Sequence, residues 1–230
     1  KINKMREIVL DTETTGLNYK AGDRIIEVGC VELINHVSTT NNLQFYCSTN
    51  KIIDESATKI HGLTNAFLNE YPPFKEHVKK FLAFIGNDPL IIHNAEFDLG
   101  FINNELMLLG IEPLKNKIID TVSFARKKLN TRIANLDYLC RRFQIDLSER
   151  DLHGALLDSQ LLAEVYLELM GGKQISLNLN ITKENKNLPS KNNIKKNYLF
   201  SRVVLNDKDT LLHKSLVKGI KDSLWKKFDY

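Results

Sequence analysis

The sequence is poor in cysteine and has no long apolar run, and each shortage excludes a class of protein. Its three cysteines, Cys30, Cys47 and Cys140, are an odd number at spacings that fit no zinc motif. We interpret them as reduced, mostly buried residues of a cytoplasmic protein. No apolar stretch approaches the roughly 18 residues that a membrane-spanning helix needs, and no signal-peptide pattern opens the chain. We therefore expect no membrane partner.

Neither sign of charge dominates the whole chain, which carries 32 Lys and Arg against 28 Asp and Glu. The distribution, however, is uneven. Residues 1–170 hold 19 basic and 23 acidic residues, a net charge of −4, whereas residues 171–230 hold 13 basic and 5 acidic residues, a net charge of +8. The sequence therefore predicts an acidic body and a basic tail. With 230 residues, 43% of them hydrophobic, the chain is long enough for one buried core and an extension.

Strand patterns come first along the chain and helical patterns later. Alternating apolar residues and turn residues at the start indicate three strands in a β-meander. Helical periodicity then alternates with two short apolar runs. This order favours an α/β domain with a mixed sheet. The predicted strands are 6–10, 24–34, 43–47, 89–92 and 117–119, the predicted turns are 20–23 and 35–42, and the predicted helices are 63–69, 74–85, 96–109, 121–129, 135–143 and 154–169.

The composition changes after Gly171 and Gly172, which end the last predicted helix. Residues 173–197 are dominated by Asn, Lys and Ser, so we expect a flexible linker there. Apolar residues return in 198–230, in the pattern of a strand and an amphipathic helix. About thirty residues are too few for an independent core, so this segment is expected to dock onto a partner. Packing back onto its own domain is the alternative.

The stretch 8–16 carries the strongest local signal for chemistry. Its apolar run ends in two carboxylates, Asp11 and Glu13, and side chains two residues apart on a strand project from the same face. Two like charges on one face repel each other, and a bound cation would neutralise them. A strand that runs into a polar turn explains the stretch equally well when it is considered alone.

Two later segments also place a carboxylate just inside a predicted helix. Asp98 follows the buried run 89–92, and Asp158 follows His153 at the start of the last predicted helix. Each residue has a plainer interpretation. Asp98 would be a charge at a helix N-terminus, Asp158 a solvated helix residue, and His153 a cap or a packed core residue. Asp158, however, lies among leucines, where a carboxylate usually has a partner.

Together these residues predict one reaction. Carboxylate oxygens suit Mg²⁺ or Mn²⁺, and four carboxylates can hold two such ions for in-line displacement at phosphorus. An imidazole is a suitable base for an attacking water near neutral pH, and His153 is the candidate. The prediction is metal-assisted hydrolysis of a phosphodiester. The predicted metal ligands are Asp11, Glu13, Asp98 and Asp158.

The three segments resemble, in order and rough spacing over residues 6–170, the three exonuclease motifs of the DEDDh 3′→5′ exonucleases. Within that family the resemblance is strongest to the proofreading (epsilon) subunits of bacterial DNA polymerase III. It implies a ribonuclease H-like fold with a mixed β-sheet flanked by helices, two metal ions on the four carboxylates, and His153 as the general base. The motifs read Asp11-Thr-Glu13-Thr-Thr-Gly, His93-Asn-Ala-Glu-Phe-Asp98 and His153-Gly-Ala-Leu-Leu-Asp158.

The resemblance also implies residues that contact a DNA 3′ end. Thr14 follows the metal carboxylates, and the segment that begins at His61 resembles one that lies beside the terminal nucleotide in the family. Ser56 stands where relatives can carry an acidic substrate contact, so this sequence departs from the pattern there. A surface histidine before a helix is the plainer interpretation of His61. The implied substrate contacts are Asp11, Glu13, Thr14, Ser56, His61 and Asp158.

The same resemblance assigns partners to the tail. Gln174, Leu177 and Leu179 match a sliding-clamp-binding peptide at 174–179, with aliphatic residues three and five positions after a glutamine. Residues 198–230 resemble the segment that binds the polymerase (alpha) subunit, and the family also implies a small third core subunit. The implied organisation is an exonuclease domain at 1–172, a linker at 173–197 and a polymerase-binding tail at 198–230.

Two other functions remain open on the sequence alone. A stand-alone DEDDh nuclease that trims RNA or short oligonucleotides would carry the same motifs, but such enzymes generally have no tail of this kind. A scaffold that has lost catalysis would bridge polymerase and clamp, but all five catalytic positions are intact. The leading prediction is a 3′→5′ exonuclease that proofreads for a replicative polymerase.

Overall fold

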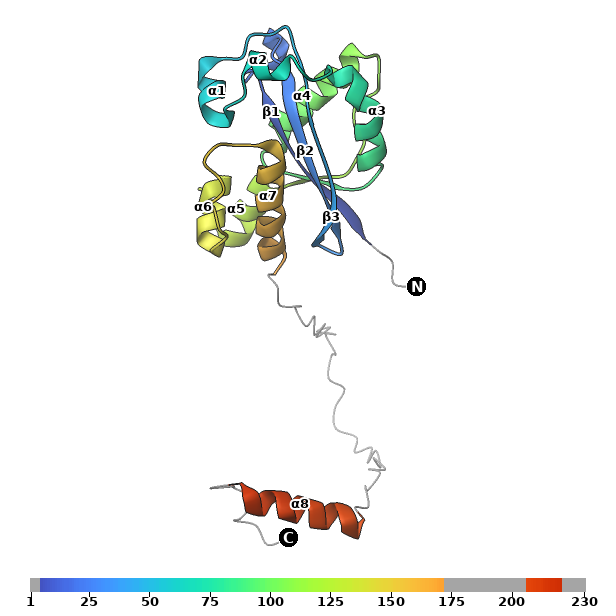
Figure 1. Ribbon diagram of the computed structural model, residues 1–230, viewed down its shortest axis with the longest axis vertical. Helices are drawn as coiled ribbons and strands as arrows, with labels where there is room; N and C mark the ends of the chain where they lie inside the picture. The colour runs from blue at the N-terminus through green and yellow to red at the C-terminus, as the bar shows by residue number, and fades with distance from the viewer. Residues whose placement is uncertain (1–4, 172–205, 221–230) are drawn as a thin grey trace, which may run out of the picture. The chain divides into compact units, whose positions relative to one another are not determined.

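The computed structural model of the chain describes residues 5–171 and 206–220. The chain divides into two units, residues 1–178 and 179–230. The first unit contains a five-stranded sheet in the order β3-β2-β1-β4-β5, with helices on both faces (Figure 1). The predicted α/β fold with a mixed sheet is confirmed. The strands are β1 (Arg6–Thr14), β2 (Ile25–Ile34), β3 (Val37–Tyr46), β4 (Leu90–Ile92) and β5 (Ile118–Asp120).

The helices of the first unit follow the predicted apolar periodicity closely. The predictions for 74–85 and 121–129 are correct at both ends, because each pattern has a clear buried face and a clear stop. The helices are α1 (Glu55–His61), α2 (Asn65–Leu68), α3 (Phe74–Ile85), α4 (Ala95–Leu108), α5 (Thr121–Leu129), α6 (Leu136–Phe143) and α7 (Ala155–Met170), with a short 3-10 helix η1 (Tyr19–Ala21).

Strand β1 lies at the centre of the sheet and sets its geometry. It pairs with β2 in the antiparallel sense and with β4 in the parallel sense, so that Leu10 lies beside Ile92. Because β1 and β4 run in the same direction, both end at the same edge of the sheet. Helix α4 begins three residues after β4, at that edge. The carboxyl end of β1 and the first turn of α4 therefore lie close together.

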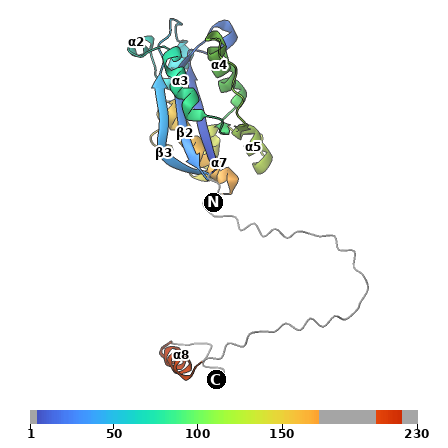
Figure 2. The ribbon, with the colours of Figure 1, turned by 90° about the vertical axis from the view of Figure 1, so that its right-hand side faces the viewer.

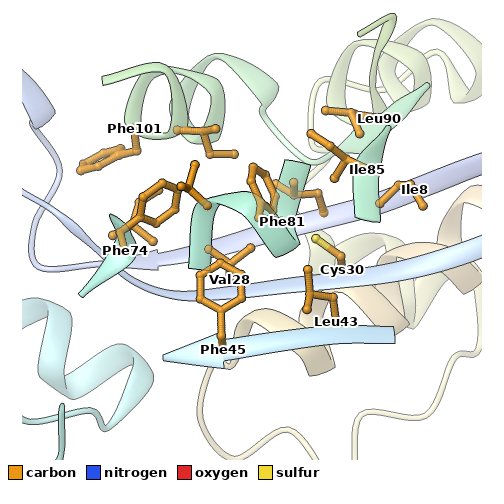
Figure 3. Packing of buried hydrophobic residues seen from close by; sticks show 14 of the residues in the cluster. Ile8, Val28, Cys30, Leu43, Phe45, Phe74, Phe81, Ile85, Leu90 and Phe101 are labelled. Carbon is orange, nitrogen blue, oxygen red and sulfur yellow. The ribbon is translucent and has the colours of Figure 1, made fainter. Parts of the chain in front are cut away.

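Two apolar clusters, one on each face, hold the sheet between its helices. Ile8 and Leu10 of β1 pack with α3 and α4, which face the viewer in Figure 2, whereas Val9 packs with α6 and α7. The two clusters thus separate the α3–α4 face from the α5–α7 face. Figure 3 shows the first cluster, in which Phe74, Phe81 and Ile85 of α3 pack with Val28, Cys30, Phe45 and Phe101.

The structure differs from the sequence predictions at two places in the first unit: one prediction is wrong and one helix was not predicted. The predicted turn at 35–42 is mostly strand, since β3 begins at Val37 and the turn is only Asn35 and His36, both with positive φ (52° and 66°). The first half of β3 is polar and exposed, as an edge strand can be, so it carries no apolar alternation. Helix α1 has no predicted counterpart, because its seven residues are too few to show a clear apolar periodicity.

The described part of the second unit is one helix, α8 (Asp207–Gly219), which confirms the predicted helix in the tail. Asn206 caps it by accepting a hydrogen bond from the backbone N–H of Asp209 at 2.8 Å. Leu211, Leu212 and Leu216 are each more than 60% exposed. The predicted linker at 173–197 and the clamp-binding peptide at 174–179 lie outside the described residues. No helix within the described ranges is long and apolar enough to cross a membrane.

Candidate active site

Asp11 and Glu13 project from the end of β1 toward the face that α7 covers. Side chains alternate along a strand, and Val9 on the same side packs in the cluster that contains α7. The prediction that these two carboxylates share one face of a strand is confirmed. Glu27 on β2 lies directly opposite Glu13 and is 2% exposed, so a further buried carboxylate adjoins the pair.

Asp98 reaches the same edge of the sheet from α4, on the opposite face. It lies in the first turn of α4 and is 3% exposed. The hydroxyl of Thr12, which points to the α4 side of β1, donates a hydrogen bond to Asp98 Oδ1 at 2.7 Å. Thr12 therefore holds the carboxylate of Asp98 against the end of β1, although α4 packs on the face away from α7.

Asp158 is brought to the site by a close approach of α7 to β2. The N–H of Ala155 donates to Glu27 Oε2 at 3.1 Å, and the hydroxyl of Ser159 donates to the Gly29 carbonyl at 3.0 Å. A side chain at Gly29 would collide with the backbone of Ala155, because a Cβ there would lie 2.2 Å from its carbonyl carbon. Glycine at this position therefore lets the first turn of α7, with Asp158, lie directly over β2.

His153 lies in the loop before α7, beside Asp158. Its backbone N–H donates to the Ile60 carbonyl at 3.0 Å, which ties the loop to α1. Its side chain is 45% exposed, and its Nδ1 is 3.4 Å from Asp158 Oδ2. One potential ligand atom from each of Glu13, His153 and Asp158 lies within 4.8 Å of the others. The α7 side of the site thus contains three of the predicted residues in one compact group.

Burial raises the pKa of three carboxylates of the site, and neighbouring carboxylates add to the rise for Asp11 and Glu13. Burial raises the pKa of Glu13 to about 8, and the nearby charges of Glu27 and Asp158 contribute. Burial also raises the pKa of Asp11, with Asp98 as its strongest charged neighbour, and that of Asp98, where the Thr12 hydrogen bond opposes the rise. So many carboxylates cannot all be ionised without a cation among them. The donor set fits a hard divalent cation.

Arg150 is a cation of the chain itself within this group of acids. Its Nε and Nη2 donate to Asp158 Oδ1 and Oδ2 at 2.6 and 2.7 Å, the two-pronged geometry typical of arginine and carboxylate. Its Nη1 donates to Asp137, and its Nη2 lies 3.2 Å from both ring nitrogens of His153. The Arg150 side chain is only 7% exposed. Sequence reasoning missed this residue.

A cavity of about 590 Å³ opens beside these side chains. One part of its lining consists of Asp11, His93, Arg150, His153 and Asp158. Burial lowers the pKa of His93, whose Nδ1 lies 2.9 Å from the Thr121 hydroxyl. The other part is lined by the loop before α6 and by α6 itself: Ile133, Asn135, Leu136, Asp137, Tyr138 and Arg141. The volume lies within the usual range for a small-molecule ligand pocket.

The predicted substrate residues lie around the end of β1. The hydroxyl of Thr14 is buried and donates to the Gly16 carbonyl at 2.7 Å. His61 is the last residue of α1 and is 5% exposed, so the interpretation as a surface histidine is wrong. Its Nδ1 accepts a hydrogen bond from the N–H of Leu63 at 3.0 Å. Ser56 is exposed on the same helix.

Glu27 and Thr12, like Arg150, belong to the site without being singled out in the sequence. The signal for Glu27 was an acidic residue between apolar neighbours in a predicted strand, because a buried carboxylate needs a partner. Thr12 stands between Asp11 and Glu13, but alternation assigns it to the opposite face. Its contact with Asp98 depends on where α4 packs. Arg150 shows no local pattern, since a lone arginine in a polar loop is common.

The chain is similar to known exonucleases over most of its length. The exonuclease family model matches residues 8–166. DNA polymerase III subunit epsilon of Rickettsia conorii is 47% identical over 177 residues, covering 75% of this chain and 77% of the relative. The protein of the same name from Buchnera aphidicola is 42% identical over 230 residues, covering 96% of this chain and 99% of the relative.

The fold is also that of a solved exonuclease. The nuclease domain of 3′hExo, a DEDDh family member bound to rAMP, superposes with a TM-score of 0.64 at 18% identity, over 74% of this chain and 94% of that one. The DEDDh exonucleases generally use divalent metal ions, in keeping with the donor set described above. The chain therefore belongs to the exonuclease family, as a 3′→5′ exonuclease that groups with the DNA polymerase III epsilon subunits.

Proposed function

We propose that this exonuclease removes nucleotides from DNA 3′ ends with two divalent cations, Mg²⁺ or Mn²⁺, and proofreads for DNA polymerase III. The observation that carries the proposal is the convergence of four carboxylates and one imidazole, from β1, α4 and the start of α7, at one edge of the sheet. Asp11, Glu13, Asp98 and Asp158 would hold the cations, and His153 would act as the general base.

The bound cations would supply charge stabilisation at the phosphodiester and a more acidic attacking water. The chain's own residues then have distinct tasks. His153, a half-exposed side chain that lines the cavity, would take the proton from the water. Thr12 fixes Asp98, and the contact of α7 with Gly29 fixes Asp158. These constraints come from buried groups, so the carboxylates are held in place before substrate arrives.

Substrate contacts are proposed for Thr14, His61 and Ser56, in addition to Asp11, Glu13 and Asp158. Because the Thr14 hydroxyl already donates to Gly16, its contact to the 3′ terminus would be through the backbone or through the hydroxyl oxygen as an acceptor. His61 ends α1, the helix whose Ile60 carbonyl accepts from the N–H of His153. Helix α1 thus links the proposed substrate residues to the proposed base.

The proposal extends to the tail and to the partners. Residues 1–170 have a net charge of −4, so the catalytic part would not attract the DNA backbone strongly by charge. A tether to a polymerase would supply effective concentration instead. We assign the exonuclease domain to 1–172, the linker to 173–197 and polymerase binding to 198–230, with clamp binding by Gln174, Leu177 and Leu179. The exposed leucines of α8 support a docking role.

Two further parts of the proposal concern assembly and location. A small third core subunit would join the complex, as in the group that the chain resembles. The three cysteines are free and buried, and we place the enzyme in the cytoplasm, where thiols stay reduced. The naming of relatives as DNA polymerase III subunits favours DNA over RNA as the substrate.

The decisive experiment is digestion of primer termini by the full chain, with and without its DNA polymerase III alpha subunit. The chain should release nucleotides from a single-stranded 3′ end in Mg²⁺, and the polymerase should direct that activity to mismatched rather than matched termini. A matched Glu13→Gln variant should be inactive in every arm. Equal or faster digestion of RNA, unaffected by the polymerase, would contradict the proposal and favour a stand-alone nuclease.

A further inference from the structure

Both carboxylate oxygens of Asp158 are already occupied by the fork of Arg150. The two hydrogen bonds measure 2.6 and 2.7 Å, and both side chains are almost wholly shielded from solvent (7% and 6% exposed). A buried charge pair of this kind lacks competition from water and is much stronger than an exposed pair. Any other cation that binds Asp158 therefore competes with the fork of Arg150 for the same two oxygens.

Arg150 has a second anchor that does not depend on Asp158. Its Nη1 donates to Asp137, whose side chain is 46% exposed. Its Nη2 also lies 3.2 Å from both ring nitrogens of His153, so the guanidinium touches both proposed functional residues of this segment. If the fork leaves Asp158, Asp137 can retain the guanidinium at the edge of the cavity that both residues line.

We propose that Arg150 is a positioning residue that occupies Asp158 until a divalent cation takes that carboxylate. In the metal-free enzyme the fork neutralises Asp158 and orders His153. On metal binding, Asp158 exchanges the fork for the cation, and Arg150 stays on Asp137. Because the exchange breaks hydrogen bonds between Arg150 and Asp158, the enzyme binds the cation less tightly than it would without Arg150. This inference rests on the proposed function, because it takes Asp158 to be a metal ligand.

If Arg150 had only a structural role, its substitution would change the metal affinity in the opposite direction. If Arg150 only held the loop together, its removal would disorder Asp158 and His153 and weaken metal binding. An occupying arginine, when shortened, leaves Asp158 available and strengthens metal binding. Two effects must be separated: loss of the fork and loss of one positive charge near the metal. Arg150→Lys keeps the charge but lacks the planar guanidinium that makes two parallel hydrogen bonds, so it isolates the fork.

The test is calorimetric titration of the full chain with Mn²⁺, without nucleic acid. Arg150→Lys and Arg150→Gln should bind Mn²⁺ on the order of tenfold more tightly than the wild type, or about 1.4 kcal/mol. Arg141→Gln is the matched control, since Arg141 lines the same cavity but is exposed and makes no bond to Asp158 among the described residues. It should leave the affinity unchanged. Asp158→Asn should weaken binding in the otherwise wild-type chain.

Each result decides one point. Weaker binding by the Arg150 variants would show a structural role and overturn the inference. A second result would also overturn the inference: Arg150→Lys binds Mn²⁺ with the affinity of the wild type and only Arg150→Gln binds more tightly. The effect of Arg150 would then come from its charge alone and not from the fork. Identical titrations of wild type and Asp158→Asn would instead overturn the proposed metal site. If Arg150→Gln does not fold, Arg150→Lys still decides the question.

A spectroscopic measurement on the wild-type chain gives an independent readout. The Nε–H proton of Arg150 should be protected from solvent exchange in the metal-free enzyme, because it is buried on Asp158. Addition of Mg²⁺ should shift its NMR signal and speed its exchange, and the signal can be assigned by its absence from Arg150→Lys. A signal that Mg²⁺ leaves unchanged while Mg²⁺ binds would also overturn the inference.

Discussion

At the scale of single residues, the site stores electrostatic repulsion that a metal ion would relieve. Glu13 faces Glu27 across the strand pair, and both are at most 9% exposed. Burial raises the pKa of each, and hydrogen bonds from Gln44 and Ala155 oppose the rise for Glu27. Such carboxylates are easily accommodated when protonated and poorly when ionised, so the stability of the metal-free protein should depend on pH.

The sign of that dependence follows from Glu13. Its pKa is about 8 in the folded protein against an ordinary value of 4.5. As the pH rises between these values, the unfolded chain loses this proton and the folded chain keeps it, so the free energy of unfolding falls. The raised pKa values of Asp11 and Asp98 act in the same direction.

We expect the melting temperature in EDTA to fall by at least about 4 °C between pH 5 and pH 8, a loss on the order of 1–2 kcal/mol. Saturating Mg²⁺ at pH 8 should restore much of the loss. The matched variant Glu13→Gln cannot ionise and should show a smaller fall. A melting temperature in EDTA that rises with pH over this range would refute the electrostatic reading of the site.

Replacement of His153 by glutamine should separate chemistry from metal binding. The variant keeps a polar side chain but lacks the base, so turnover should drop by about 10²–10⁴-fold. Mn²⁺ affinity should change far less. Release of nucleotides from a 5′-labelled single strand measures the first quantity and calorimetry the second. A variant whose pH–rate profile keeps its limb near neutrality would require another base.

The sequence predicts some residues of the site better than others, for a physical reason. Asp11 and Glu13 stand out because strand alternation alone puts them on one face, and this prediction is confirmed. Asp98 and Asp158 stand out less, because each has a plainer interpretation when it is considered alone, and only the set of three segments together predicts a metal site. Arg150 and Thr12 were missed because their contacts depend on how α4 and the loop before α7 pack, which no local pattern records.

At the scale of elements, the contact between α7 and β2 decides where Asp158 lies. The added methyl group of Gly29→Ala would meet backbone rather than a flexible side chain, so the first turn of α7 must move. We expect destabilisation on the order of 1–3 kcal/mol in urea unfolding, with a larger relative loss of nuclease activity because Asp158 moves with the helix.

Gly154→Ala is the matched control for stability. Gly154 has an extended backbone (φ −152°), and nothing lies within 4 Å of the position that its Cβ would take. Its free energy of unfolding should therefore stay close to that of the wild type. Similar destabilisation by both substitutions would mean that the effect comes from loss of glycine in general rather than from the close approach at Gly29.

Element predictions from the sequence succeeded where burial shapes the pattern and failed where it does not. Helix α3 buries Phe74, Val78, Phe81 and Ile85 on one face, and its predicted bounds are correct. The first half of β3 buries little, and its strand character comes from pairing with β2, which sequence periodicity does not report. Helix α1 is short and mostly exposed, so sequence periodicity does not reveal it either.

At the scale of the whole molecule, we propose that residues 1–172 carry out catalysis and that the tail brings them to the polymerase. Deletion of residues 173–230 should leave activity on a free oligonucleotide within about twofold, because every carboxylate of the site lies before residue 171. It should abolish co-purification with the polymerase subunit. The double substitution Leu212→Ser and Leu216→Ser, on exposed positions four apart along α8, should weaken that association without unfolding the first unit. Retained association after deletion would contradict the assignment of the tail.

The site joins the first strand of the chain to the last helix of the first unit, and this has a consequence for synthesis. A nascent chain that has emerged only as far as α6 contains Asp11, Glu13 and Asp98 but lacks Asp158 and the α7 cover over β1 and β2. It cannot complete the proposed metal site or the second core cluster. On the proposed site, nuclease activity should therefore begin only once α7 has left the ribosome and docked, and a product that terminates before α7 should have none.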